Sequence, residues 1–142
     1  MTDLTRFHES QRQDYKIALE EVKQGRKQSC WMWYIFPQIV GLGRNNFAHF
    51  YSIKTLQEAK DYLEDEVLGK RLIEISEELL KLETNDALKV FGYPDNLKLK
   101  SCMTLFSIAN SKEEVFQKVL DKFFDGEKDE LTIEILKNMN NM

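Results

Sequence analysis

The densest group of side chains that could do chemistry lies between Cys30 and Asn46, in the run C-W-M-W-Y-I-F-P-Q-I-V-G-L-G-R-N-N. Both tryptophans of the chain, Trp31 and Trp33, lie here two residues apart. An indole ring buries a large apolar area and carries an N–H that needs a partner, so it suits a pocket wall and a protein core equally. Two interpretations follow: an aromatic cluster of the core, or a slot for a flat ligand such as a nucleobase.

Polar side chains follow the two tryptophans and favour the ligand-binding interpretation. Four of them surround a pair of glycines: Gln38, Arg44, Asn45 and Asn46. Solubility alone does not require so many hydrogen-bonding groups in one short segment. The Gly41-Leu-Gly43 segment could also present backbone N–H groups to an anion before a helix, although it lacks the third glycine and the preceding strand of a dinucleotide-binding fingerprint. A tight turn that requires positive φ is the alternative explanation.

A second candidate group lies at Asp95, Lys98 and Ser101, in the segment from Phe91 to Phe106. On a helix these three residues lie along one stripe, because residues three and four apart are neighbours. The apolar residues that follow indicate that this stripe runs toward the core. A lysine at such a boundary can bind an anionic ligand or, when desolvated, act as a base. The alternative is a helix N-cap at Asp95 with an exposed ion pair, which contributes little to stability.

The sequence contains none of the familiar catalytic or metal-binding motifs. His8 and His49 have no motif around them, and no G-x-S-x-G, H-E-x-x-H or P-loop pattern is present. We therefore expect no metal and no cofactor. Whether the protein is an enzyme stays open at this point; an enzymatic version would use Asp95 or Lys98 for proton transfer.

Apolar residues at helical spacing predict the elements that position these groups. The spacing i, i+3, i+4, i+7 indicates a helix over residues 10–24, which Gly25 ends. A second periodic stretch indicates a helix over residues 66–82. The run from Trp31 to Phe36 has no hairpin partner nearby, and we predict a buried helical turn or an extended segment there. A further helix is expected after Gly43.

Capping residues predict where other helices begin. Thr55-Leu-Gln-Glu58 and Ser111-Lys-Glu-Glu114 both have the capping-box form, and a short helix follows the first. Asp95 and Asp129 are predicted N-caps of two further helices. Because the sequence shows no internal repeat and no linker, it predicts a single domain spanning residues 1–142. The predicted fold class is all-α, with about seven or eight short helices around one core.

The composition is typical of a soluble globular protein. Hydrophobic residues make up 42% and charged residues 31% of the 142 residues, and the formal net charge is −4. We expect no nucleic-acid partner, because a general nucleic-acid binder carries a basic excess. We also expect no membrane association, since no stretch approaches the roughly 20 apolar residues of a membrane helix.

The N-terminus and the thiols suggest a cytoplasmic location. The polar N-terminus lacks the apolar run of a secretory signal. Two cysteines, Cys30 and Cys102, are too few for a disulfide framework, so we expect both to be reduced. Cys102 falls in a nearly apolar helix, which predicts a raised thiol pKa.

Many of these residues also match the pattern of a known family. The segment Trp31-Met-Trp-Tyr-Ile-Phe-Pro-Gln38 is its most specific element, and Gly41-Leu-Gly43, Phe91-Gly92 and Met103-Thr-Leu-Phe106 add to it. The chain resembles the domain-of-unknown-function family 1810 over nearly its whole length. The resemblance implies a small, mainly α-helical bacterial protein, of a group in which some members are labelled calpastatin-like. It implies no activity, substrate or catalytic residue.

Two positions depart from the pattern of that family. Cys30 stands where the family commonly has a histidine before the W-M-W segment, and Asp65-Glu66 stand where it often has His-Pro. Neither a cysteine nor an acid can take over the role of a histidine base or metal ligand unchanged. A site shared with the family would therefore use the aromatic and polar residues named above.

The leading hypothesis is that the chain binds a small, anionic and partly aromatic ligand such as a nucleotide derivative. The candidate ligand-binding residues are Trp31, Trp33, Gln38, Arg44, Asn45, Asp95, Lys98 and Ser101. The tryptophans would form walls, the two amides would orient polar edges, and the arginine and lysine would meet negative charge. Both segments must then meet across one cleft. The alternative is a non-catalytic protein-interaction or structural module, in which the aromatic patch is a binding surface or simply core.

Overall fold

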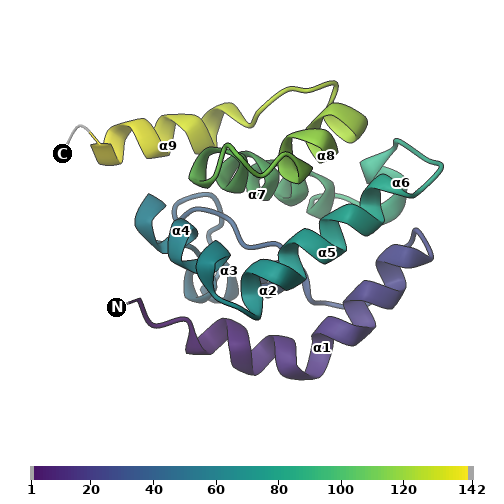
Figure 1. The fold of residues 1–142 in the computed structure, drawn as a ribbon, viewed down its shortest axis with the longest axis horizontal. Coiled ribbons are helices and arrows are strands. Elements are labelled where there is room, and N and C mark those ends of the chain that lie inside the picture. The colour runs from purple at the N-terminus through teal and green to yellow at the C-terminus, as the bar shows by residue number, and fades with distance from the viewer. Residues whose placement is uncertain (1, 141–142) are drawn as a thin grey trace.

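The fold is built from helices alone within residues 2–140, the part of the chain that the computed structural model describes (Figure 1). Nine helices follow one another there: α1 (Thr5–Lys23), α2 (Met32–Ile35), α3 (Asn46–Phe50), α4 (Leu56–Glu64), α5 (Leu68–Leu80), α6 (Ala87–Phe91), α7 (Asp95–Ala109), α8 (Val115–Phe124) and α9 (Glu130–Asn140). The predicted all-α class is confirmed. The helix that the sequence did not indicate is α6, whose five residues are too few to show a period.

The central helix is α7, which contacts α4, α6, α8 and α9. Nine of its fifteen residues are buried, and a helix covered on several sides has apolar residues all round rather than along one stripe. In Figure 1, α1 runs along the bottom of the view, α5 crosses the middle, and α8 and α9 close the top. The first turn of α7, which carries Asp95 and Lys98, is half-buried or exposed.

Two local predictions are confirmed at the end of α1 and beyond it. Gly25 follows the helix with a φ of 78°. Its N–H donates to Val22 O at 2.9 Å, and the Arg26 N–H donates to Glu21 O at 3.0 Å, which is the bond pattern of a Schellman motif. The run from Trp31 to Phe36 contains α2, the predicted buried helical turn.

The capping box predicted at Ser111 is not formed, and this prediction is wrong. Helix α8 begins only at Val115. Asn110 follows α7 and holds a turn over the next residues, because its Oδ1 accepts the Lys112 N–H at 3.1 Å and its carbonyl accepts the Glu113 N–H at 3.2 Å. This turn occupies the residues that the capping box would have placed in the first turn of the helix.

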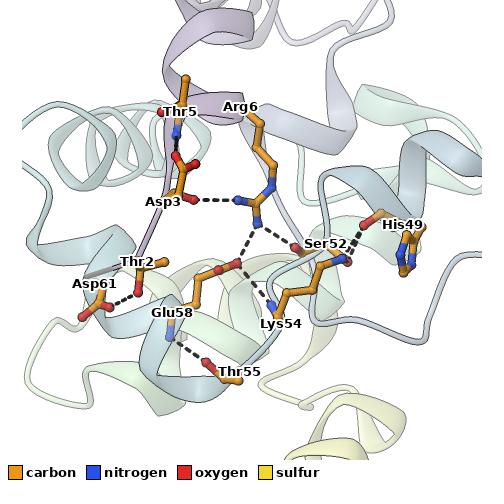
Figure 2. A network of polar contacts seen from close by, with 10 residues as sticks. All are labelled: Thr2, Asp3, Thr5, Arg6, His49, Ser52, Lys54, Thr55, Glu58 and Asp61. Atoms are coloured by element: carbon orange, nitrogen blue, oxygen red, sulfur yellow. Dashed lines mark hydrogen bonds and ion pairs between the residues drawn. The ribbon is translucent and has the colours of Figure 1, made fainter.

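A polar network joins the start of α1 to the chain between α3 and α4 (Figure 2). Arg6 Nη2 donates to Ser52 O at 2.9 Å and to Glu58 Oε1 at 2.6 Å. Lys54 Nζ donates to Ser52 Oγ and to His49 O, both at 2.6 Å. The network therefore holds the segment that follows α3 against α1, and with it the position of α3 itself.

The same network modifies the capping box predicted at the start of α4. Thr55 Oγ accepts the Glu58 N–H at 3.0 Å, as predicted. The return bond goes one residue further back, because Glu58 Oε1 accepts the Lys54 N–H at 3.2 Å while it also binds Arg6. Burial, with a smaller contribution from the Arg6 charge, lowers the pKa of the Lys54 ammonium.

Asp65 precedes α5 and links this helix to α1. Its Oδ1 accepts the N–H groups of Val67 and Leu68 at 2.9 and 3.0 Å, and its Oδ2 lies 2.8 Å from His8 Nε2. Burial alone would raise the pKa of Asp65, but the hydrogen bonds from Leu68, His8 and Val67 outweigh this effect, and the pKa lies below its ordinary value.

Asp65 is expected to make the free energy of unfolding depend on pH in the acidic range. A carboxyl group whose folded pKa is depressed stabilises the fold above its unfolded pKa of about 3.9, and this contribution is lost as the pH falls through the folded pKa. Asp65→Asn should therefore lower the free energy of unfolding at neutral pH and flatten its decline between about pH 5 and pH 2. Urea unfolding followed by circular dichroism measures this, with the exposed Glu64→Gln as control; parallel pH profiles for wild type and Asp65→Asn would contradict it.

Candidate functional site

The loop that leads into the tryptophan segment is fixed by one carboxylate of α1. Glu21 Oε1 accepts the backbone N–H groups of Gln28 and Ser29 at 2.7 and 2.9 Å, and it accepts the Trp31 Nε1–H at 2.9 Å. Ser29 Oγ donates to the other oxygen at 2.6 Å. Burial would raise the pKa of Glu21, but the four hydrogen bonds lower it below its usual value, so the carboxylate stays charged.

Trp31 belongs to the core. It is 1% exposed, and its ring packs against Phe36 and Phe91 at centroid distances of 6.1 and 6.4 Å. Its indole N–H is satisfied by Glu21. Of the two interpretations of the tryptophan segment, the core cluster therefore applies to Trp31, which does not form the pocket wall that the leading hypothesis assigned to it.

Trp33 lies on the other side of α2 and reaches the surface. Two residues along a helix correspond to a rotation of about 200°, so the two indoles point in nearly opposite directions. The Trp33 ring packs against the Phe47 ring of α3, with a centroid distance of 5.5 Å and an interplanar angle of 31°. Lys98 Nζ lies 4.7 Å from the Trp33 ring centroid, within the range of a cation–π interaction. The Trp33 indole N–H is buried, with no hydrogen-bond partner in residues 2–140.

A cleft of about 390 Å³ lies beside Trp33, where the α2–α3 connection faces α7 and the start of α9. Five of the eight predicted ligand-binding residues line it: Trp33, Gln38, Asn45, Lys98 and Ser101. The two segments, more than fifty residues apart in the sequence, thus meet as the hypothesis required. The volume of the cleft lies within the range of small-molecule sites. The three remaining candidates, Trp31, Arg44 and Asp95, are not among the lining residues.

Asp95 has a role different from the predicted N-cap. It is the first residue of α7, after the N-cap position of Pro94. Its carboxylate forms ion pairs with Lys27 Nζ at 2.9 Å and with Lys98 Nζ at 3.1 Å. The prediction of a cap is wrong because Lys27, from the α1–α2 loop, supplies a charged partner that the local sequence does not show. Asp95 instead holds Lys98 near Trp33.

Asp129 is a cleft residue that the sequence indicated only as a helix cap. Its Oδ2 accepts the N–H and the Oγ–H of Thr132 at 3.1 and 2.6 Å, so the predicted cap of α9 is confirmed. The same oxygen lies 3.2 Å from Ser101 Oγ, and the Asp129 N–H donates to Thr104 Oγ at 2.8 Å. These bonds place the start of α9, including Leu131, on the cleft.

The cleft also has an apolar rim that local patterns did not reveal. Pro94 and Leu97 contribute from the start of α7, and Leu131 contributes from α9. Leu97 and Leu131 are 48% and 60% exposed. Leu97 and Leu131 line the same cleft because α9 packs against α7, and no short sequence motif predicts this packing.

With this geometry in place, comparison with known proteins identifies the family. The family described as "Protein of unknown function (DUF1810)" matches residues 1–136. The chain belongs to this family. Its fold is similar to that of the conserved hypothetical protein Rv1873 from Mycobacterium tuberculosis, with 39% sequence identity and a TM-score of 0.93. The match covers 95% of this chain and 96% of the other. No curated protein matches the chain.

Cys30 and Asp65 of this DUF1810 chain have different surroundings. Cys30 is exposed next to the tryptophans, and Asp65 pairs with His8. Cys102 is buried in α7, and burial raises the pKa of its thiol, as its apolar surroundings predicted.

Within residues 2–140 there is no group of three or more histidine, cysteine or acidic side chains placed to hold a metal ion. No helix in these residues has the length and apolar character needed to span a bilayer.

Proposed function

We propose that the cleft beside Trp33 binds a small, anionic and partly aromatic ligand, for which a nucleotide derivative is the model. The observation that carries this proposal is the convergence of five candidate residues from two distant segments on one cleft. Binding sites combine apolar walls with a few convergent polar groups. Here a partly exposed indole, three leucines and a proline supply the walls, while a lysine, two amides and a hydroxyl supply the polar groups.

Each polar group has a defined task in the proposed complex. Lys98 meets the negative charge of the ligand, and Trp33 stacks against its flat ring. Asn45 Oδ1 is occupied by the Ala48 N–H at 2.7 Å, so this amide would serve the ligand as a hydrogen-bond donor. Gln38 binds a second polar edge. Arg44, exposed on the loop next to Asn45, adds positive charge without lining the cleft.

Asp129 and Ser101 extend the proposed site toward ligand hydroxyls. The Asp129 carboxylate would repel an anion if it were isolated, but three hydrogen bonds and the N-terminus of α9 compensate its charge. A carboxylate in such a position accepts hydrogen bonds from sugar hydroxyls, as acidic residues do in dinucleotide sites. A ribose between the ring and the phosphate of the ligand would suit this arrangement.

Tryptophan fluorescence tests the proposal, because the chain has two tryptophans in contrasting environments. In Trp31→Phe only Trp33 reports, and in Trp33→Phe only the core tryptophan reports. Titration with AMP, ADP and ADP-ribose should give a saturable change in Trp31→Phe and none in Trp33→Phe, which also serves as the control for light absorption by the ligand. Lys98→Ala should weaken binding about tenfold, the effect of losing one charge-assisted contact. Absence of saturable binding by fluorescence and by calorimetry would refute the proposal.

A change in cleft shape provides a second test. A Cβ atom on Gly43 would lie 2.3 Å from Ala48 Cβ, so Gly43→Ala must push the loop away from α3. This variant should weaken nucleotide binding although it removes no polar group. Adding Ala48→Gly removes the clash and should restore part of the affinity. Equal affinity of all three proteins would show that the loop is not part of the site.

The alternative function, a protein-interaction module, has support of its own. Phe47, Leu97 and Leu131 expose large apolar side chains around Trp33 and the cleft, and clustered exposed apolar groups mark interaction surfaces. If no nucleotide saturates the Trp33 signal, this surface becomes the better-supported functional feature.

A further inference from the structure

A second hollow, of about 600 Å³, shares Trp33 with the cleft but lies against α1. Four aromatic side chains line it: Trp33, Tyr34, Phe47 and Tyr51. Two carboxylates, Glu9 and Asp14 of α1, lie among the remaining lining residues. Among residues 2–140, no lysine, arginine or histidine lines this hollow. Its charge is thus opposite to the lysine of the neighbouring cleft.

The aromatic walls present rings rather than free hydroxyl groups. Tyr51 Oη is paired with Ser10 Oγ at 2.5 Å, and Tyr34 Oη donates to Asp14 Oδ2. Burial, together with this bond, raises the pKa of Tyr34, so the phenol stays protonated and keeps donating. The Tyr34 and Tyr51 rings meet edge to face at 5.0 Å, and Phe47 stays 62% exposed at the border.

Aromatic walls with adjacent carboxylates are chemically selective for organic cations. The negative face of an aromatic ring attracts a cation, and this attraction is used to recognise quaternary ammonium groups. A guanidinium or a primary ammonium would need several hydrogen-bond acceptors. Here both tyrosine hydroxyls are engaged, so the acceptors left in the lining are those of the α1 side chains. A methylated ammonium has no such requirement.

We propose that this hollow binds the quaternary ammonium group of a small molecule, with the four rings as walls and Asp14 and Glu9 as counter-charges. A free small molecule fits because the hollow has the volume of a small-molecule site. The proposal requires no ligand in the neighbouring cleft, although Trp33 lines both sites. Asp14, half-buried and held by Tyr34, supplies the fixed part of the charge.

Choline and its uncharged isostere 3,3-dimethylbutan-1-ol provide the decisive comparison, since they share shape and differ in charge. Calorimetric titration of the full chain should show saturable binding of choline, about tenfold tighter than that of the isostere. Phe47→Ala and Asp14→Asn should each weaken choline binding several-fold. Phe47 is largely exposed, and the amide oxygen introduced by Asp14→Asn would still accept the Tyr34 hydroxyl, so both variants should fold; circular dichroism checks this.

Lys98→Ala distinguishes the two sites, because Lys98 lines the cleft and not this hollow, while its ammonium lies over the Trp33 ring that both sites share. It should weaken nucleotide binding, and choline binding should stay the same or become tighter, because a competing cation is removed from Trp33. The two proposals can therefore fail separately. Equal binding of choline and the isostere would reduce the hollow to an apolar groove and overturn the proposal. Absence of saturable choline binding would overturn it too. A trimethyl-lysine peptide that binds more than about tenfold tighter than choline would overturn the small-molecule assignment.

Discussion

Trp31→Ala is expected to lower the free energy of unfolding by about 3–5 kcal/mol, the usual cost of truncating a buried large aromatic side chain. The indole is almost completely buried and packs between Phe36 and Phe91, so its removal leaves a cavity that these rings cannot fill. It also removes one of the four donors that hold the Glu21 carboxylate. A partly buried charge that loses a donor adds to the cost.

The comparison with Trp33 makes this prediction specific. Trp33→Ala should cost less, about 2 kcal/mol, because the ring is already partly exposed and loses less transfer free energy. Trp31→Phe should recover most of the loss in packing and leave only the hydrogen bond to Glu21 unmade. Urea unfolding followed by far-ultraviolet circular dichroism measures all three variants without relying on the tryptophan signal. Similar losses for Trp31→Ala and Trp33→Ala would contradict the assignment of one indole to the core and the other to the site.

The sequence could predict the helices whose signals are local. Leu68, Leu72, Ile75 and Leu79 form the buried side of α5, and helical spacing alone indicates such a stripe. Gly25 and Asp129 mark helix ends through bonds to residues only a few positions away. Ser111 failed as a cap because the competing turn at Asn110 satisfies the same kind of local preference. Local rules cannot choose between two such solutions.

The candidate site was predictable in its residue types and less so in its geometry. The composition of the two candidate segments was enough to include Trp33, Lys98 and their polar neighbours in the ligand-binding hypothesis, and these residues line one cleft. It could not distinguish Trp31 from Trp33, because the choice depends on Glu21, ten residues upstream. It also could not give Asp95 its partner Lys27. These are tertiary contacts between elements, and neither spacing nor composition encodes them.

Glu58→Ala is expected to destabilise the protein by about 3 kcal/mol, close to the cost of breaking a buried ion pair from one side. The Arg6 and Glu58 side chains are only 15% and 11% exposed, and their charged atoms lie 2.6 Å apart. Without the carboxylate, the Arg6 guanidinium remains largely buried with one fewer acceptor, and the Lys54 N–H loses its partner. Both losses leave a hydrogen-bond donor unsatisfied in a largely buried environment. The free-energy cost of such a donor exceeds what a solvent-exposed hydrogen bond contributes to stability.

Two further variants separate charge from hydrogen bonding in this network. Glu58→Gln keeps an acceptor for Arg6 and for the Lys54 N–H, so it should cost about half as much as Glu58→Ala. In a double-mutant cycle with Arg6→Met, the loss of both partners should be smaller than the sum of the single losses, by about 1–3 kcal/mol. The Lys118–Glu114 pair, exposed on both sides, provides the control, since Lys118→Met should change stability by less than about 0.5 kcal/mol. Additive single losses at Arg6 and Glu58 would mean that this ion pair does not help to hold the segment after α3 against α1. The position of α3, which carries Phe47 of the hollow and Ala48 of the cleft, would then not depend on the pair.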